Sequence, residues 1–181
     1  MPELPEVETV RLQLLAHLSG KTIASIEVWH QKTIAFDKNF KRRLTGKTID
    51  HIDRVGKLLI ISFSDWPGWF VLAHLKMTGQ FFFVAPGRGP VGAGHRQHLP
   101  NKHTRVAFHF TDGSSLYFND MRLFGYTKLA DATTTAAARA LFGPEPIAED
   151  FDIEWFIGAV RKRKAPIKAV LLDQSFIAGL G

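Results

Sequence analysis

Residues 106–118, VAFHFTDGSSLYF, decide the fold class of this chain. Apolar residues alternate with other residues on both sides of Asp112-Gly113, a dipeptide that favours a tight turn between paired strands. The segment therefore predicts a β-hairpin with one buried face. Its inward-facing residues would be Val106, Phe108, Phe110, Leu116 and Phe118.

Upstream of this hairpin, most of the sequence also favours strands. Residues 23–29, 48–53, 58–63 and 69–85 are rich in β-branched and aromatic side chains. Before them, Pro5 suits the first turn of a helix, apolar residues recur at helical spacing, and Gly20 ends the helix. Many strands with one early helix predict a β-sandwich or barrel.

Downstream of residue 130 the pattern becomes helical. Residues 133–141 are alanine-rich, and Phe142-Gly-Pro-Glu-Pro146 interrupts the helix that they predict. Asp152 can cap a helix to about residue 164, and Pro166 can start another that ends near residue 174. The apolar face of the helix after Asp152 would comprise Trp155, Phe156 and Val160.

We therefore expect an α+β protein of two units. Residues 1–130 would form a β-sandwich flanked by helices, and residues 131–181 would begin a helical domain. The last residues, FIAGLG, are apolar and no partner segment follows them. This pattern predicts a fragment that stops inside the second domain.

Composition narrows the classes of function. The 181 residues are 45% hydrophobic with a mean hydropathy of −0.03. No apolar run approaches the ~20 residues that span a bilayer, and no secretory signal is present, so we expect a cytoplasmic protein without a membrane partner. The 23 basic residues against 17 acidic ones favour a polyanionic partner. Without cysteine there is no disulfide or thiolate zinc site, and His95 with His98 makes only a weak metal site, so no metal is predicted.

The first eight residues, MPELPEVE, suggest covalent chemistry. Initiator methionine is usually trimmed before a small residue such as proline, which would leave Pro2 with a free secondary amine. An α-amino group has a pKa near ~8 and can attack a carbonyl-like carbon to form an iminium. Glu3 is placed for proton transfer. The competing interpretation is that Pro-Glu only opens a helix.

Three internal motifs each allow two interpretations. Lys57 follows Arg54-Val55-Gly56 in a tight turn. It could be a solvated lysine, or it could be a fixed cation near Pro2. Residues 74–79, HLKMTG, interrupt an apolar strand region, and Met77 could be a core residue, as its own pattern favours, or a flexible apolar probe at a strand end. Arg122 and Phe124 could read a base edge and wedge into a base stack, or could form an ordinary turn with Phe124 buried.

A basic run, Arg161-Lys162-Arg163-Lys164, is followed by Lys168. Such a run is often only a solvated face, but beside a helix N-terminus it can also bind phosphate.

In combination and in this order, these motifs closely resemble the bacterial formamidopyrimidine-DNA glycosylase family, which excises oxidised purines such as 8-oxoguanine. The resemblance spans essentially the whole chain. It rests on the opening MPELPEVET, Lys57 in its turn, and the motifs at residues 74–79, 120–125, 142–146 and 172–181.

The resemblance implies a mechanism and a helix-two-turn-helix second domain. Pro2 would attack C1′ of the damaged nucleotide, Glu3 would donate a proton, and Lys57 would contact phosphate and act in β-elimination. The enzyme would be a bifunctional glycosylase and abasic-site lyase that needs no cofactor within this chain. The family's zinc finger lies in a C-terminal region that this chain does not include.

The resemblance also implies the DNA contacts. Met77, Arg122 and Phe124 would fill the void left by the flipped nucleotide, with Arg122 facing the orphaned cytosine. The other residues assigned to DNA binding are His74, His103, Arg163, Lys164 and Lys168. The partner would be damaged double-stranded DNA, bound by a monomeric, nucleoid-associated bacterial protein.

Two departures from the family pattern matter. Leu123 stands where the family usually has a second arginine, and Arg163 stands where it commonly has lysine. Three alternatives stay open: an endonuclease VIII-type enzyme for oxidised pyrimidines, a DNA-damage-binding module without turnover, and a tautomerase that uses an N-terminal proline. Leu4, Met77 and Phe124 favour the purine branch over the pyrimidine branch.

Overall fold

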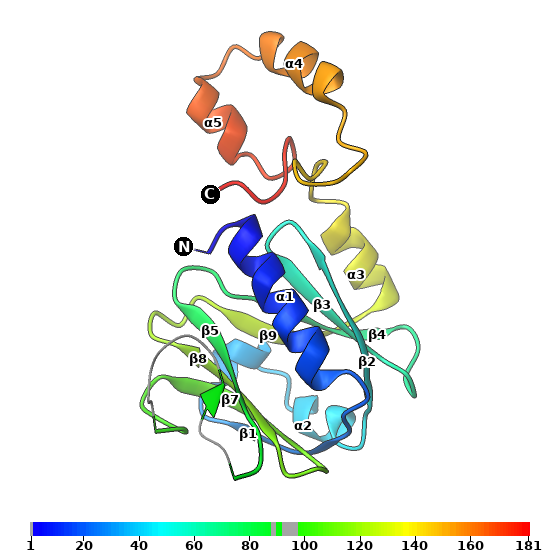
Figure 1. The fold of residues 1–181 in the computed structure, drawn as a ribbon, viewed down its shortest axis with the longest axis vertical. Coiled ribbons are helices and arrows are strands. Elements are labelled where there is room, and N and C mark those ends of the chain that lie inside the picture. Colours follow the sequence, from blue (N-terminus) through cyan, green and yellow to red (C-terminus); the bar gives the residue numbers. More distant parts are fainter. Residues whose placement is uncertain (1, 88–89, 92–97) are drawn as a thin grey trace.

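A computed structural model describes residues 2–87, 90–91 and 98–181 of this α+β protein. Within these ranges, two antiparallel sheets pack face to face, with strand orders β1-β7-β8-β5-β6 and β2-β3-β4-β9 (Figure 1). The strands are β1 Ile23–Val28, β2 Ile49–Val55, β3 Leu58–Phe63, β4 Trp69–His74, β5 Gly79–Val84, β6 Pro90–Val91, β7 Thr104–Phe110, β8 Ser115–Asp120 and β9 Tyr126–Asp131.

The hairpin predicted from residues 106–118 is present as β7 and β8. Val106 pairs with Phe118, and Phe108 pairs with Leu116. The turn closes through Gly113, whose φ of 81° suits glycine, and Asp112 Oδ1 accepts the N–H of Ser114 at 2.9 Å. The local sequence was sufficient here because turn chemistry and alternation agree.

The strand-rich region of residues 69–85 forms two strands, β4 and β5, which are separated at residues 75–78. The chain reverses between β4 and β5, and the two strands belong to different sheets. Lys76 in this turn has a φ of 54°, and the Gly79 N–H donates to Leu75 O at 2.9 Å. Lys76 and Thr78 interrupt the apolar run here, but the local sequence does not show that the two strands join different sheets.

The helix α1 (Leu4–Leu18) lies against both β2 and β5 and so bridges the sheets. Glu3 is its N-cap, and the Glu3 N–H donates to Glu6 Oε2 at 2.8 Å. Two short helices between β1 and β2 were not predicted, a 3-10 helix η1 (Gln31–Ile34) and α2 (Phe40–Leu44). They are too short to show helical periodicity, and they close one end of the sandwich with buried Ile34 and Phe40.

Three helices follow β9, namely α3 (Ala132–Arg139), α4 (Ile153–Arg161) and α5 (Ile167–Leu172). Asp152 caps α4 as predicted, because its Oδ1 accepts the Trp155 N–H at 2.8 Å. Phe156 and Val160 of α4 pack on a small core around Phe176, whereas Trp155 remains 43% exposed. Figure 1 shows α4 and α5 standing apart from the sandwich.

No helix in the described ranges is long and apolar enough to cross a membrane.

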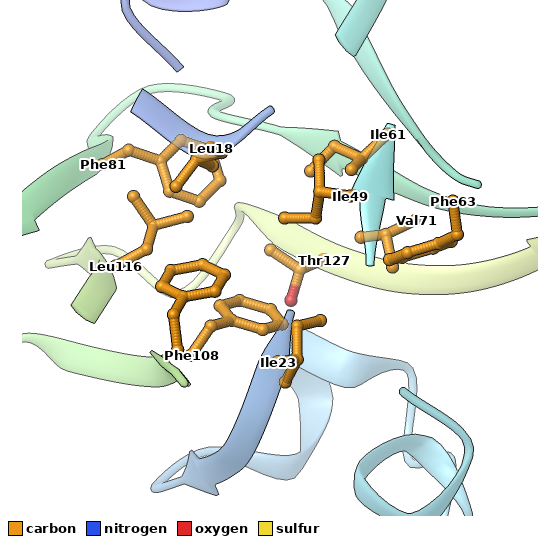
Figure 2. A pocket seen from close by; sticks show the side chains of 11 residues that line it. Leu18, Ile23, Ile49, Ile61, Phe63, Val71, Phe81, Phe108, Leu116 and Thr127 are labelled. Carbon is orange, nitrogen blue, oxygen red and sulfur yellow. The ribbon is translucent and has the colours of Figure 1, made fainter. Parts of the chain in front are cut away.

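A small cavity lies in the sandwich core between the sheets (Figure 2). Its volume is about 20 Å³, and ten of its eleven lining side chains are apolar. The exception is Thr127 on β9, which is 1% exposed and whose Oγ1 has no hydrogen-bond partner among the described residues. A buried water needs two to four polar partners, so this space stays dry.

Replacing Thr127 by valine should therefore stabilise the protein by about 1 kcal/mol, because a buried hydroxyl without a partner is removed at nearly constant shape. Urea unfolding followed by circular dichroism measures this change as a higher midpoint at an unchanged slope. The matched control is Thr104→Val, which should destabilise, since Thr104 Oγ1 accepts the Asn101 N–H at 2.9 Å. A lower midpoint for Thr127→Val would contradict the prediction.

Candidate active site

Lys57, in the turn between β2 and β3, is only 6% exposed. Its Nζ donates a hydrogen bond to Leu180 O at 2.6 Å, 123 positions away in the sequence. Burial lowers the pKa of Lys57; the nearby Glu3 carboxylate acts in the opposite direction, and the charge of Lys76 adds to the lowering. Lys57 is therefore a held cation close to Glu3, and the interpretation as a solvated turn lysine is wrong.

The first residues of α1 meet the same segment as Lys57. The Leu4 N–H donates to Gly179 O at 3.1 Å, one residue before the carbonyl that holds Lys57. At Gly179, where φ is 95°, a Cβ would lie 2.2 Å from Leu4 Cδ1, so only glycine allows this approach. Figure 1 shows both ends of the chain at this place. Pro2 and Glu3, immediately before Leu4, therefore lie close to Lys57.

Gln174, which the sequence did not single out, shapes the Gly179-Leu180 backbone. Its Nε2 donates to Leu180 O at 2.7 Å, and its Oε1 accepts the Gly179 N–H at 2.9 Å. Leu180 O thus accepts from both Gln174 and Lys57. One glutamine side chain orders the backbone that joins the start of α1 to Lys57.

His74, at the end of β4, borders this region. Burial, with the positive charges of Lys76 and Lys57, lowers the pKa of His74 to about 4. Its Nδ1 accepts the Lys76 N–H at 3.0 Å, which leaves the proton of the neutral ring on Nε2. At pH 7 His74 can donate a hydrogen bond but carries no charge, so it cannot bind phosphate as a cation.

A buried ion network contacts the residues directly before Lys57 and holds its turn in place. The Arg54 guanidinium, with 7% of its side chain exposed, donates to Glu8 Oε2 and to Glu145 Oε1, each at 2.7 Å. Glu145 Oε1 also accepts the Gly56 N–H at 2.6 Å. Glu145 lies in the segment of residues 142–146, in which the sequence indicated a helix breaker and a family motif but no ion pair with Arg54.

Glu8 makes stability sensitive to acid. Hydrogen bonds from Arg11 and from Arg54, against the opposing effect of burial, lower the pKa of Glu8 to about 2 from 4.5. Since the folded-state pKa is the lower one, this stabilisation is complete above pH 4.5 and is lost as pH falls toward 2. We expect Glu8→Gln to lose less unfolding free energy than the wild type between pH 5 and 2, as measured by urea titrations. Equal losses would show that Glu8 does not titrate as described.

The side chains predicted to enter DNA are exposed on two turns. Met77 is 42% exposed and Phe124 is 48% exposed, so neither is a core residue. The Arg122 guanidinium carbon lies 5.0 Å from the centre of the Phe124 ring. A groove of about 360 Å³ runs beside Met77, and its lining residues include His103 and Met121. Met77 and His103 therefore line one groove, and the Arg122 N–H donates to Thr78 Oγ1 at 3.0 Å, so the Arg122 loop lies beside the Met77 turn.

The remaining predicted residues are more scattered. Arg163, Lys164 and Lys168 are all exposed around the connection between α4 and α5. Arg163 lies over the Phe176 ring with 4.8 Å between its guanidinium carbon and the ring centre, and none of the described contacts ties these cations to Lys57. Met1 and His95 lie outside the described residues, and within these residues no cluster of three metal-ligating side chains occurs.

Comparison with known proteins adds independent information. Residues 1–127 match the model of the formamidopyrimidine-DNA glycosylase N-terminal domain. A formamidopyrimidine-DNA glycosylase from Lactobacillus johnsonii is 43% identical over all of this chain and 62% of its own length. The chain thus spans about three fifths of that relative.

Solved structures of Lactococcus lactis Fpg are similar to this chain over nearly its full length. One, in complex with DNA that contains an abasic site, is 35% identical with a TM-score of 0.82, and the match covers 99% of this chain and 62% of the other. A second, bound to DNA that contains N7-benzyl-Fapy-dG, has the same identity and TM-score, with coverages of 99% and 63%.

Proposed function

Because the chain belongs to the formamidopyrimidine-DNA glycosylase family, we propose that it acts in base-excision repair as a DNA glycosylase and abasic-site lyase for oxidised purines. The observation that carries this proposal is the shared backbone of Gly179 and Leu180, which contacts both the start of α1 and Lys57. A nucleophile at the N-terminus and a buried cation are thereby brought to one place.

The chemistry proceeds on C1′ of the damaged nucleotide. After removal of Met1, the Pro2 amine forms a bond to C1′ as the glycosidic bond to the base breaks, and the sugar ring opens to an iminium with a proton supplied through Glu3. The iminium acidifies the C2′ proton. Loss of that proton expels the 3′ phosphate oxygen, and the strand is cut by β-elimination without any cofactor.

Lys57 has two features that suit this sequence of steps. Lys57 is buried and its pKa is lowered, so its ammonium group gives up a proton more readily than that of a solvated lysine. Its ammonium group can also donate to a phosphate oxygen beside the lesion. His74 would contribute a neutral donor at the same edge.

DNA must be opened before Pro2 can reach C1′. We assign void filling to Met77, Arg122 and Phe124, which are exposed and apolar or cationic as such a wedge requires. His103, Arg163, Lys164 and Lys168 would contact phosphates. The partner is then damaged duplex DNA, in agreement with the DNA held by the similar solved structures.

We further propose that residues 1–130 form the catalytic sandwich and that residues 131–181 begin a helix-two-turn-helix unit. The exposed apolar residues Ile153, Ile157 and Ile167 on α4 and α5 agree with a helical unit that has further packing partners.

Incision of defined duplexes tests the proposal. One duplex carries 8-oxoguanine opposite cytosine and a second carries dihydrothymine opposite adenine, with products separated on a denaturing gel. We expect the first to be cut at least ~10-fold faster, since a pocket built to hydrogen-bond one base disfavours another. The reverse order would favour the endonuclease VIII-type alternative. Binding to both without cutting would favour a damage-binding module.

A further inference from the structure

Asp120, the last residue of β8, is a carboxylate with only 1% of its surface exposed. Its Oδ1 accepts the N–H of Arg122 at 3.1 Å, and its Oδ2 accepts the N–H of Gly125 at 2.7 Å. A Cβ at Gly125 would lie 2.7 Å from Phe118 Cζ, so the loop closes tightly on the sheet. One side chain thus holds both ends of the loop that carries Arg122 and Phe124.

Thr78 ties the neighbouring turn to the same carboxylate. Its hydroxyl donates to Asp120 Oδ1, and its Oγ1 accepts the Arg122 N–H at 3.0 Å. The next residue, Gly79, is paired with Asp120 between β5 and β8. The turn that presents Met77 and the loop that presents Arg122 are therefore joined by strand pairing at their base and by the hydroxyl group of Thr78 above it.

The backbone of both segments is strained beside the exposed side chains. Lys76, just before Met77, has a φ of 54°, and Leu123, between Arg122 and Phe124, has a φ of 60°. Left-handed backbone at non-glycine residues costs free energy and persists only where surrounding contacts enforce it. The hydrogen bonds of Thr78 and Asp120 are such contacts.

We propose that Thr78 and Asp120 are positioning residues that make Met77, Arg122 and Phe124 a single preformed wedge. The inference rests on the proposed function, because it assumes that these side chains enter opened DNA. Side chains held in place before binding lose less conformational entropy on insertion. The hydroxyl of Thr78 acts through Arg122 and Phe124, so its effect on DNA insertion depends on their presence.

A double-mutant cycle on DNA insertion tests this dependence. The duplex carries a tetrahydrofuran abasic-site analogue, which cannot form a Schiff base, with 2-aminopurine opposite it. Fluorescence then reports filling of the void and yields an affinity without chemistry. Thr78→Val and Thr78→Ser are compared in the wild type and in the background Arg122→Ala/Phe124→Ala.

We expect Thr78→Val to weaken binding about tenfold in the wild type and less than about twofold in the Arg122→Ala/Phe124→Ala background, which keeps only Met77 of the wedge. Thr78→Ser, which keeps the hydroxyl, should restore wild-type binding. Thr45→Val is the matched control, because Thr45 Oγ1 donates only to Lys41 O at 2.9 Å at the end of α2, and it should leave binding unchanged. Thermal unfolding of every variant verifies that it is folded.

Two results would overturn the proposal. Thr78→Val could bind DNA as tightly as the wild type. Alternatively, it could weaken the affinity by the same factor in both backgrounds, which would mean that the hydroxyl does not act through Arg122 and Phe124. If the wild type itself gave no signal with this duplex, the proposed function would fail first, and the two failures are thereby distinguished.

Discussion

Protein that retains Met1 should form no covalent adduct with abasic-site DNA in the presence of borohydride, whereas protein that begins at Pro2 should be trapped efficiently. With Met1 attached, the nitrogen of Pro2 is an amide and cannot attack C1′, and the only α-amine is displaced by one residue. Loss of an enzyme's nucleophile costs about 10³-fold or more in rate. Mass spectrometry of each preparation, followed by a denaturing gel of the trapped complex, measures both states. Pro2→Gly leaves a primary α-amine in place of the secondary one, and we expect it to be trapped less efficiently than protein that begins at Pro2.

The matched control addresses the other candidate amine. Lys57 is buried with a lowered pKa and so could itself act as a nucleophile. We expect Lys57→Met to slow strand cutting but to keep the trapped adduct. If Lys57→Met abolished the adduct while Met1-retaining protein still formed it, the assignment of Pro2 would be wrong. Equal trapping of the protein that retains Met1 and of the protein that begins at Pro2 would place the nucleophile elsewhere in the chain.

Arg54→Ala should destabilise the fold by about 3–5 kcal/mol, the range for removal of one partner from a buried ion network. The guanidinium is 7% exposed and contacts Glu8, Glu145 and the Gly56 carbonyl, the last at 2.8 Å. Without it, Glu145 loses the cation that it pairs with, and Glu8 keeps only Arg11. Urea unfolding measures the loss, and Arg42→Ala, at an exposed site on α2, should change stability by less than about 0.5 kcal/mol. A loss below about 1 kcal/mol for Arg54→Ala would mean that the network contributes little.

The same substitution also tests how the Lys57 turn is held. Arg54 and Glu145 both bond to Gly56, directly before Lys57. A Cβ at Gly56 would lie 2.6 Å from Phe142 Cδ1, so the turn is enclosed from this side too. We therefore expect Arg54→Ala to reduce strand cutting at temperatures where the variant is still folded.

Several features followed from local sequence. The β7–β8 hairpin depends on residues at most about a dozen positions apart, and the start of α1 and the cap at Asp152 on residues within about five positions, so these signals are read directly. The motif resemblance also identified the family that the comparisons support. The interruption at residues 74–79 was visible in the sequence, but the placing of β4 and β5 in different sheets was not.

For the candidate site, too, some features followed from the sequence and others only from the tertiary structure. The sequence by itself supplied the assignment of the chemistry that we propose for Pro2, Glu3 and Lys57, since residue type and motif point to them. Only the tertiary structure decided that Lys57 is buried, that Gln174 orders the backbone between it and α1, and that Thr78 joins the two exposed turns. These contacts join residues that are 123 and 42 positions apart. They form only when the sheets and the C-terminal segment pack together, because burial and hydrogen bonding at such separations depend on the whole fold rather than on any local pattern.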